Sequence, residues 1–120
     1  MKDIHMGTAE MQFTDLVWQN QPINSTALVN LAGEVMNWQK STSYTVLKRL
    51  CAKGVLKNEK STVTALISKE EYLATESQRI VGELFGGSIP MFLAAFREKA
   101  DLSEEDWACL RRMIEEHEEK

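Results

Sequence analysis

Six hydrogen-bonding side chains recur at helical spacing within residues 39–54, near the middle of the chain. They are Ser41, Thr42, Tyr44, Thr45, Lys48 and Arg49. Thr42, Thr45 and Arg49 are three and four residues apart, and the other three repeat this spacing one position earlier, so all six share one side of an α-helix. Short hydroxyl groups let a helix approach base edges, and cations neutralise backbone phosphates. This combination predicts a helix that enters the major groove of double-stranded DNA.

The opposite side of the same helix is apolar. Its apolar residues recur at three- and four-residue spacing and are Val46, Leu47, Leu50 and Cys51. This pattern indicates a helix that buries one stripe in a core. The hydroxyl run that starts at Ser41 is expected to cap the helix N-terminus, because such oxygens accept hydrogen bonds from first-turn amides. Gly54 is expected to end the helix in a left-handed conformation.

Further elements are expected on both sides of this helix. Apolar periodicity predicts a helix over residues 8–18 and a second one that begins at Asn24 or Ser25, either of which can cap it. This second helix and the polar-faced one, joined by a tight connection, match a helix-turn-helix arrangement. After Gly54, two short apolar or β-branched runs separated by a polar turn predict a hairpin, or wing.

The wing carries cations that can contact phosphate. Lys57 and Lys60 are expected near its tip, where they would reach the DNA backbone but read few bases. We assign residues 1–67 to a winged-helix domain. The expected fold class is mainly α with a small β-hairpin: a winged helix-turn-helix domain followed by a helical domain.

Residues 68–120 are expected to form that helical domain. Ser68 and Glu71 form a capping box that starts one helix, Ser88 and Pro90 start a second, and Ser103 starts a third. The apolar residues of these helices are too numerous to remain exposed to water and too few to form a complete hydrophobic core. They are Leu84, Phe85, Phe92, Phe96, Trp107, Leu110, Met113 and Ile114.

Two arrangements can cover these apolar residues. We favour a homodimer, in which the same helices of a second subunit pack against them. A two-fold dimer would place two DNA-binding helices about 34 Å apart and would require a palindromic operator. The alternative is that the helices fold back on the winged-helix domain of their own chain.

Charge is divided unevenly along the chain. The 120 residues carry a net charge of −4, but residues 1–67 carry +2 and residues 68–120 carry −6. Residues 38–60 hold six basic side chains and one acidic side chain. A local basic patch can bind phosphates by counterion release although the protein is acidic. On charge alone, lysines that only confer solubility explain the patch equally well.

Other classes of protein fit the sequence less well. No apolar run approaches the roughly 20 residues of a membrane span, and the N-terminus has no signal-peptide pattern, so a cytoplasmic protein without membrane insertion is expected. Cys51 and Cys109 occupy apolar helical positions, which favours free buried thiols over a disulfide or a metal site. His5 and His117 lie near the two termini, where exposed side chains are expected more than catalytic groups. We expect no catalytic site, no metal and no cofactor.

Several motifs together resemble the penicillinase repressor family over nearly the whole chain. They include RLxxKG at residues 49–54, the SKEEY segment at residues 68–72 and LFGGS at residues 84–88. The resemblance implies a homodimeric winged helix that represses β-lactamase-type or other stress-response genes, including antibiotic-resistance genes. It implies that Ser41, Thr42, Tyr44, Thr45 and Arg49 face DNA. It also implies a membrane sensor metalloprotease that triggers cleavage of the C-terminal region, at a bond corresponding to Ala95–Phe96.

The chain departs from the family pattern at several positions. The family usually has asparagine before the cleaved phenylalanine, where this chain has Ala95, and a basic residue where it has Tyr44. The single C-terminal cysteine, Cys109, excludes copper sensing through a thiolate cluster. A second functional class stays open, in which the winged helix is a non-catalytic module that binds another protein.

Overall fold

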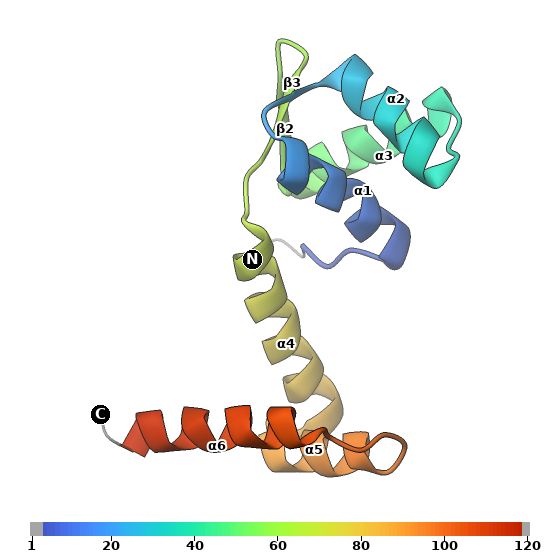
Figure 1. The fold of residues 1–120 in the computed structure, drawn as a ribbon. Coiled ribbons are helices and arrows are strands. Elements are labelled where there is room, and N and C mark those ends of the chain that lie inside the picture. The colour runs from blue at the N-terminus through green and yellow to red at the C-terminus, as the bar shows by residue number, and fades with distance from the viewer. Residues whose placement is uncertain (1–3, 119–120) are drawn as a thin grey trace. The chain divides into compact units, whose positions relative to one another are not determined.

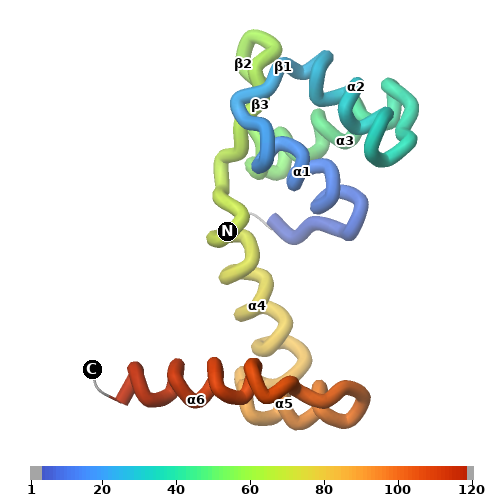
Figure 2. The backbone as a smooth tube through the Cα atoms, viewed as in Figure 1, coloured from blue at the N-terminus to red at the C-terminus, as the bar shows by residue number. Residues whose placement is uncertain are grey.

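A computed structural model describes residues 4–118 of the chain. It comprises two compact units, residues 1–77 and residues 78–120, and each is considered separately below. The elements are α1 (Thr8–Asn20), β1 (Ile23–Asn24), α2 (Ser25–Met36), α3 (Lys40–Lys53), β2 (Leu56–Glu59), β3 (Thr62–Ala65), α4 (Lys69–Phe85), α5 (Ile89–Arg97) and α6 (Glu104–Glu118). Figure 1 labels all of them except β1, which is labelled in Figure 2.

The predicted fold class is confirmed, and the sheet has one more strand than predicted. Strands β2 and β3 form the antiparallel hairpin, with Leu56 opposite Ala65 and Glu59 opposite Thr62. The additional strand, β1, pairs with the other edge of β3, so the strand order is β1-β3-β2. Because β1 has only two residues, it has no alternation that a sequence pattern could reveal.

The start of α2 follows the prediction, whereas the start of α3 does not. Asn24 caps α2, since its Oδ1 accepts hydrogen bonds from the amides of Thr26 and Ala27 at 2.9 and 3.3 Å. The expectation that hydroxyl groups cap α3 is wrong: the N-cap is Gln39, which makes no side-chain cap bond. The helix begins before the hydroxyl run, so these side chains lie inside it. Gly54 ends α3 in the left-handed region, with φ of 85°, as predicted.

One hydrophobic core holds the first unit together. It takes side chains from α1, α2, α3, both hairpin strands and the start of α4. The fully buried members include Phe13, Val17, Leu28, Leu50, Val55, Val63 and Tyr72. The ring of Trp38, in the connection between α2 and α3, stacks on Phe13 with centroids 5.7 Å apart. This core fixes the orientation of α3 relative to the hairpin. Figure 2 shows the backbone trace running from α3 directly into β2 and β3.

The first two turns of α4 belong to the first unit. Tyr72 is buried, and its hydroxyl oxygen accepts a hydrogen bond from the amide of Met6 at 2.9 Å. One turn later, Glu76 pairs with His5, with Oε1 and Nδ1 2.9 Å apart. The compact units therefore divide after Ser77, inside α4. The division into a winged-helix DNA-binding domain of residues 1–67 and a helical dimerisation domain of residues 68–120 stays a prediction.

The helices of the second unit begin as the sequence predicted. Ser88 Oγ accepts a hydrogen bond from the amide of Met91 at 3.1 Å, and Ser103 Oγ accepts one from the amide of Asp106 at 3.0 Å. Gly86 and Gly87 separate α4 from α5 and have φ values of 57° and 83°. These left-handed angles favour glycine, because a Cβ atom would strain them.

Among the described residues, no single helix is both long and apolar enough to cross a membrane. Helices α4 and α5 pass that test of length and composition only as a pair, which is bent by 81°.

Replacing Tyr72 with phenylalanine tests the attachment of α4 to the first unit. We expect Tyr72→Phe to lower the free energy of unfolding by about 1–3 kcal/mol, because the buried amide of Met6 loses its acceptor. Urea denaturation followed by circular dichroism measures this change. Tyr44→Phe is the matched control, since Tyr44 is 44% exposed. Equal stabilities of the two variants would show that the hydroxyl of Tyr72 contributes nothing.

Candidate nucleic-acid interface

Helix α3 presents all six predicted polar side chains at the surface. Ser41, Thr42, Tyr44, Thr45, Lys48 and Arg49 are exposed. Val46, Leu47 and Leu50 are buried in the core. Ser43 interrupts the hydroxyl run, because it faces inward and is fully buried, and its Oγ has no hydrogen-bond partner. The polar face therefore contains Ser41, Thr42 and Thr45 but not Ser43.

One hydroxyl group on this face already donates a hydrogen bond within the helix. Thr45 Oγ1 donates to the carbonyl oxygen of Ser41, one turn earlier, at 2.9 Å. Its lone pairs can still accept a bond from a base amino group. Within the helix, Ser41 and Thr42 are free to donate or accept, since the described contacts give their side chains no partner.

The turn of the wing consists of Lys60 and Ser61. Both have positive φ, 50° and 63°, which a type I′ hairpin turn requires at its two central positions. Lys60 is exposed. Lys57 is also exposed, but its Nζ lies 2.7 Å from Glu59 Oε2, and this hydrogen bond lowers the pKa of Glu59. The charge of Lys57 is therefore partly neutralised, and the side chain of Lys60 provides the positive charge at the turn.

A cleft joins α3 to the wing. It has a volume of about 400 Å³ and is lined by Tyr44, Leu47, Lys48, Cys51 and Asn58. Residues of the polar face and of the first hairpin strand thus border one concave surface. Burial raises the pKa of the Cys51 thiol, against a smaller opposite effect of a hydrogen bond with the backbone of Asn58. The thiol is therefore protonated at neutral pH and is not a reactive thiolate.

An acidic side chain from α1 lies against the C-terminal half of α3. Glu10 Oε1 lies 3.1 Å from Lys53 Nζ, and Glu10 Oε2 lies 3.8 Å from Arg49 Nη1. Burial alone would raise the pKa of Glu10, but Lys53, the amide of Gly7 and Arg49 together hold it below its ordinary value. Sequence analysis missed this contact. The spacing of Gly7 and Glu10 signals a helix start, whereas no local pattern pairs residues 43 positions apart.

The predicted dimer residues lie on an apolar surface of the second unit. None of the described residues 78–118 is buried. Leu84, Met113 and Ile114 are more than half exposed, and Phe92 and Phe96 are 36% and 45% exposed. Phe85, Trp107 and Leu110 are half-buried. Ile89 and Met91, which were not predicted, add to this surface with exposed fractions of 60% and 59%.

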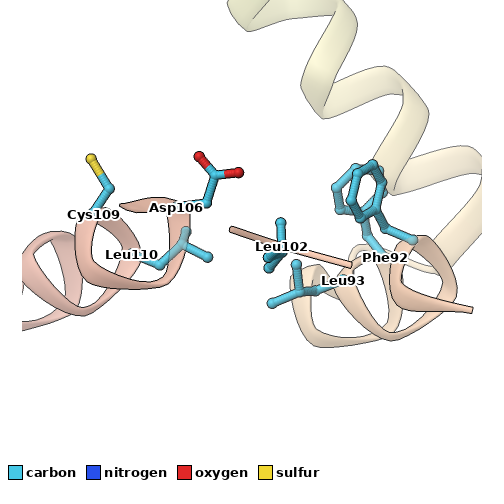
Figure 3. Close-up of a pocket in the computed structure, with 7 residues that line it drawn as sticks. Phe92, Leu93, Leu102, Asp106, Cys109 and Leu110 are labelled. Atoms are coloured by element: carbon cyan, nitrogen blue, oxygen red, sulfur yellow. The ribbon is translucent and has the colours of Figure 1, made fainter. Parts of the chain in front are cut away.

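A pocket opens between α5 and α6 in this unit. Its volume is about 270 Å³, and most of its lining is apolar (Figure 3). Phe92 and Leu93 come from α5, Leu110 comes from α6, and Leu102 lies between them in the connection. The rings of Phe85 and Phe92 meet edge to face at 5.5 Å, and Arg97 lies 5.2 Å from the Trp107 ring centroid. Helix α5 therefore contacts α4 through Phe85 and α6 through Trp107, but none of the described residues of this unit is buried.

Ala95 and Phe96 are exposed residues in the last turn of α5. The carbonyl oxygen of Ala95 accepts a hydrogen bond from the amide of Glu98 at 3.2 Å, and that of Phe96 accepts one from Ala100 at 3.1 Å. Both side chains are thus exposed, but the backbone between the two residues is helical.

Both cysteines are free, as predicted, but neither is buried. Cys51 is half-buried and Cys109 is exposed. Cys109 belongs to α6, which has no buried residue among those described, and it borders the pocket between α5 and α6. Within residues 4–118, no group of three or more His, Cys, Asp or Glu side chains is arranged to hold a metal ion.

Comparison with known proteins identifies the family. A family model described as penicillinase repressor matches residues 6–116. The chain belongs to the penicillinase repressor family. It is 26% identical to the penicillinase repressor of Bacillus licheniformis, over 98% of this chain and 95% of that protein. It is 20% identical to the methicillin resistance regulatory protein MecI of Staphylococcus aureus, over 94% of this chain and 95% of that protein.

A solved structure resembles part of the chain. It is the solution structure of the monomeric form of BlaI from Bacillus licheniformis in complex with the blaP half-operator. The match has a TM-score of 0.51 and 27% sequence identity, and it covers 60% of this chain and 94% of that one. The named relatives of this chain are thus gene regulators, and none of these names describes an enzyme.

Proposed function

We propose that this protein is a transcriptional repressor that binds double-stranded operator DNA with α3 in the major groove and the wing against the backbone. One observation carries the proposal: the six polar side chains of α3 form an exposed face that continues into the wing through a shared cleft. The similarity to a protein solved in complex with a half-operator supports it.

The side chains on this surface suit different parts of DNA. Lys48 and Lys60 are exposed cations and would contact phosphates, which set affinity and orientation. Ser41, Thr42 and Tyr44 would reach base edges, with hydroxyl groups that both donate and accept. Arg49 can pair with guanine through two hydrogen bonds. Because Tyr44 replaces the basic residue usual in the family, the preferred base sequence would differ there.

The second unit would hold two copies of the chain together as a homodimer. It exposes Leu84, Met113 and Ile114 without burying any described residue, so it lacks a closed core of its own. A second copy would cover this apolar surface and fill the pocket between α5 and α6. Two α3 helices would then bind the half-sites of a palindrome, and the linked contacts would bind far more tightly than one half-site.

Proteolysis within α5 would release the operator. A protease binds its substrate in an extended conformation, so the last turn of α5 would have to open before the Ala95–Phe96 bond is cut. Opening is favoured because α5 has nine residues and none of them is buried, and isolated helices shorter than about 12 residues are marginally stable in water. A membrane sensor metalloprotease would initiate this step, and the controlled genes would be of the β-lactamase or another stress-response type.

A charge-removal variant on α3 tests DNA binding. We expect Lys48→Ala to weaken binding to a duplex selected from a random library by about eightfold at 0.1 M salt, because one fewer counterion is released. The slope of log affinity against log salt should fall by about 0.9. Fluorescence anisotropy titrations measure both quantities. Lys99→Ala, which removes the same charge from the second unit, is the control and should bind as the unchanged protein does.

The opposite result would favour the alternative function. If the unchanged protein binds no duplex at any salt concentration, the winged helix is a surface for binding another protein. Binding that is equally weak for every duplex and insensitive to Lys48 would exclude α3 from the interface.

A charged substitution on the exposed apolar surface tests the homodimer. We expect Ile114→Glu to convert a dimer into a monomer at micromolar concentration, because a buried unpaired carboxylate at the interface is strongly unfavourable. Sedimentation velocity measures the change. Arg112→Glu places the same residue on another side of α6 and should leave the dimer intact. A monomeric unchanged protein would exclude the homodimer.

The proposed cleavage bond can be tested in cells induced with a β-lactam. We expect mass spectrometry to find a fragment that begins at Phe96. Ala95→Asn should be cut faster, because the family usually has asparagine at this position, whereas Ala94→Asn should not. An intact chain that leaves the operator on induction would show that release does not need proteolysis.

A further inference from the structure

Glu10 uses its two carboxylate oxygens differently. Oε1 accepts hydrogen bonds from the amide of Gly7 at 3.2 Å and from Lys53 Nζ at 3.1 Å, and so joins the start of α1 to the end of α3. Oε2 is buried and has no hydrogen-bond partner. The cation that approaches it is Arg49, at 3.8 Å. The structural bonds of Glu10 thus involve Oε1 alone, and they leave Oε2 to Arg49.

The partner of Oε2 belongs to the proposed DNA-binding surface. The side chain of Arg49 is 55% exposed, whereas that of Glu10 is 14% exposed. A largely exposed cation is therefore held next to a largely buried carboxylate. Because the pKa of Glu10 is lowered, its negative charge persists at neutral pH.

We propose that Glu10 determines specificity by holding Arg49 back from DNA phosphates. The inference rests on the proposed function and deepens it. A phosphate that approaches Arg49 competes with the carboxylate of Glu10 and is also repelled by it. Non-specific binding, which consists almost entirely of phosphate contacts, loses affinity through this competition.

Binding to the correct operator loses less affinity through this competition. There Arg49 can form two directed hydrogen bonds with a base, and these offset the loss of its contact with Glu10. The carboxylate also limits the orientations of the guanidinium group before DNA binds. Glu10 therefore acts as a positioning residue that widens the difference between operator and other DNA.

The experiment uses Glu10→Gln in the full chain. Glutamine retains an oxygen that can accept from Gly7 and Lys53, but it removes the negative charge. Two duplexes of equal length are titrated: one selected from a random library by the unchanged protein, and one with the same base composition in scrambled order. We expect affinity for the scrambled duplex to rise by up to about eightfold at 0.1 M salt, with a salt slope steeper by up to about 0.9. Affinity for the selected duplex should rise less.

Two further variants separate positioning from general effects. Asp15→Asn removes a carboxylate that pairs with Lys69 at 2.9 Å, away from α3, and so makes the same change in net charge. Its ratio of the two affinities should equal that of the unchanged protein. In an Arg49→Gln background, Glu10→Gln should no longer change the ratio, because the residue through which it acts is absent.

The possible outcomes are distinguishable. If Glu10→Gln lowers thermal stability but leaves the affinity ratio and the salt slope unchanged, Glu10 is only structural and the inference is wrong. The same holds if its effect persists without Arg49 or is reproduced by Asp15→Asn. Failure of the unchanged protein to bind either duplex would instead contradict the proposed function.

Discussion

The burial of one side of α3 is the constraint on which the first unit depends. Leu47 and Leu50 pack into the same core as α1, α2 and both hairpin strands, so the rotation of α3 about its axis is fixed. Because side chains three and four residues apart share a side, fixing the apolar stripe also fixes the polar face. The core thus does more than stabilise the fold: it determines which side chains meet a ligand.

The second unit, by comparison, leaves its apolar side chains poorly buried. Its helices begin at well-formed caps, such as those of Ser88 and Ser103, yet none of its described residues is buried. Local hydrogen bonds define where these helices begin, but a helix gains most of its stability from packing. A unit of this kind suits the proposed control by assembly, because a second copy would supply the missing core. It is equally suited to control by cleavage, since a short unburied helix opens easily.

In the first unit, individual basic side chains are neutralised by acidic side chains next to them. The basic stretch around α3 and the wing lies in an acidic chain, and individual cations have close acidic neighbours: Lys57 has Glu59, and Lys53 has Glu10. Such pairs reduce the number of cations that any phosphate can recruit. Lys48 and Lys60 have no acidic partner among the described ion pairs, so they are the cations proposed to contact phosphates. A repressor must avoid most of the DNA that it meets, and this balance serves that need.

Sequence alone determined the local features of this protein. These features depend on neighbours a few residues apart. They are the polar and apolar sides of α3, the start of α2 at Asn24, the end of α3 at Gly54, and the serine caps of α5 and α6. A periodic pattern records such relations directly. The family motifs extended this reading to the whole chain.

Only the tertiary structure decided the features that join distant residues. Strand β1 is too short to have a pattern and exists because β3 offers a free edge. Ser43 is buried although it lies in a hydroxyl run, and Tyr72 carries the start of α4 into the first unit. Glu10 meets Arg49 and Lys53 across some 40 residues of chain. These contacts depend on how the packed helices place side chains in space, and no short-range spacing in the sequence encodes that.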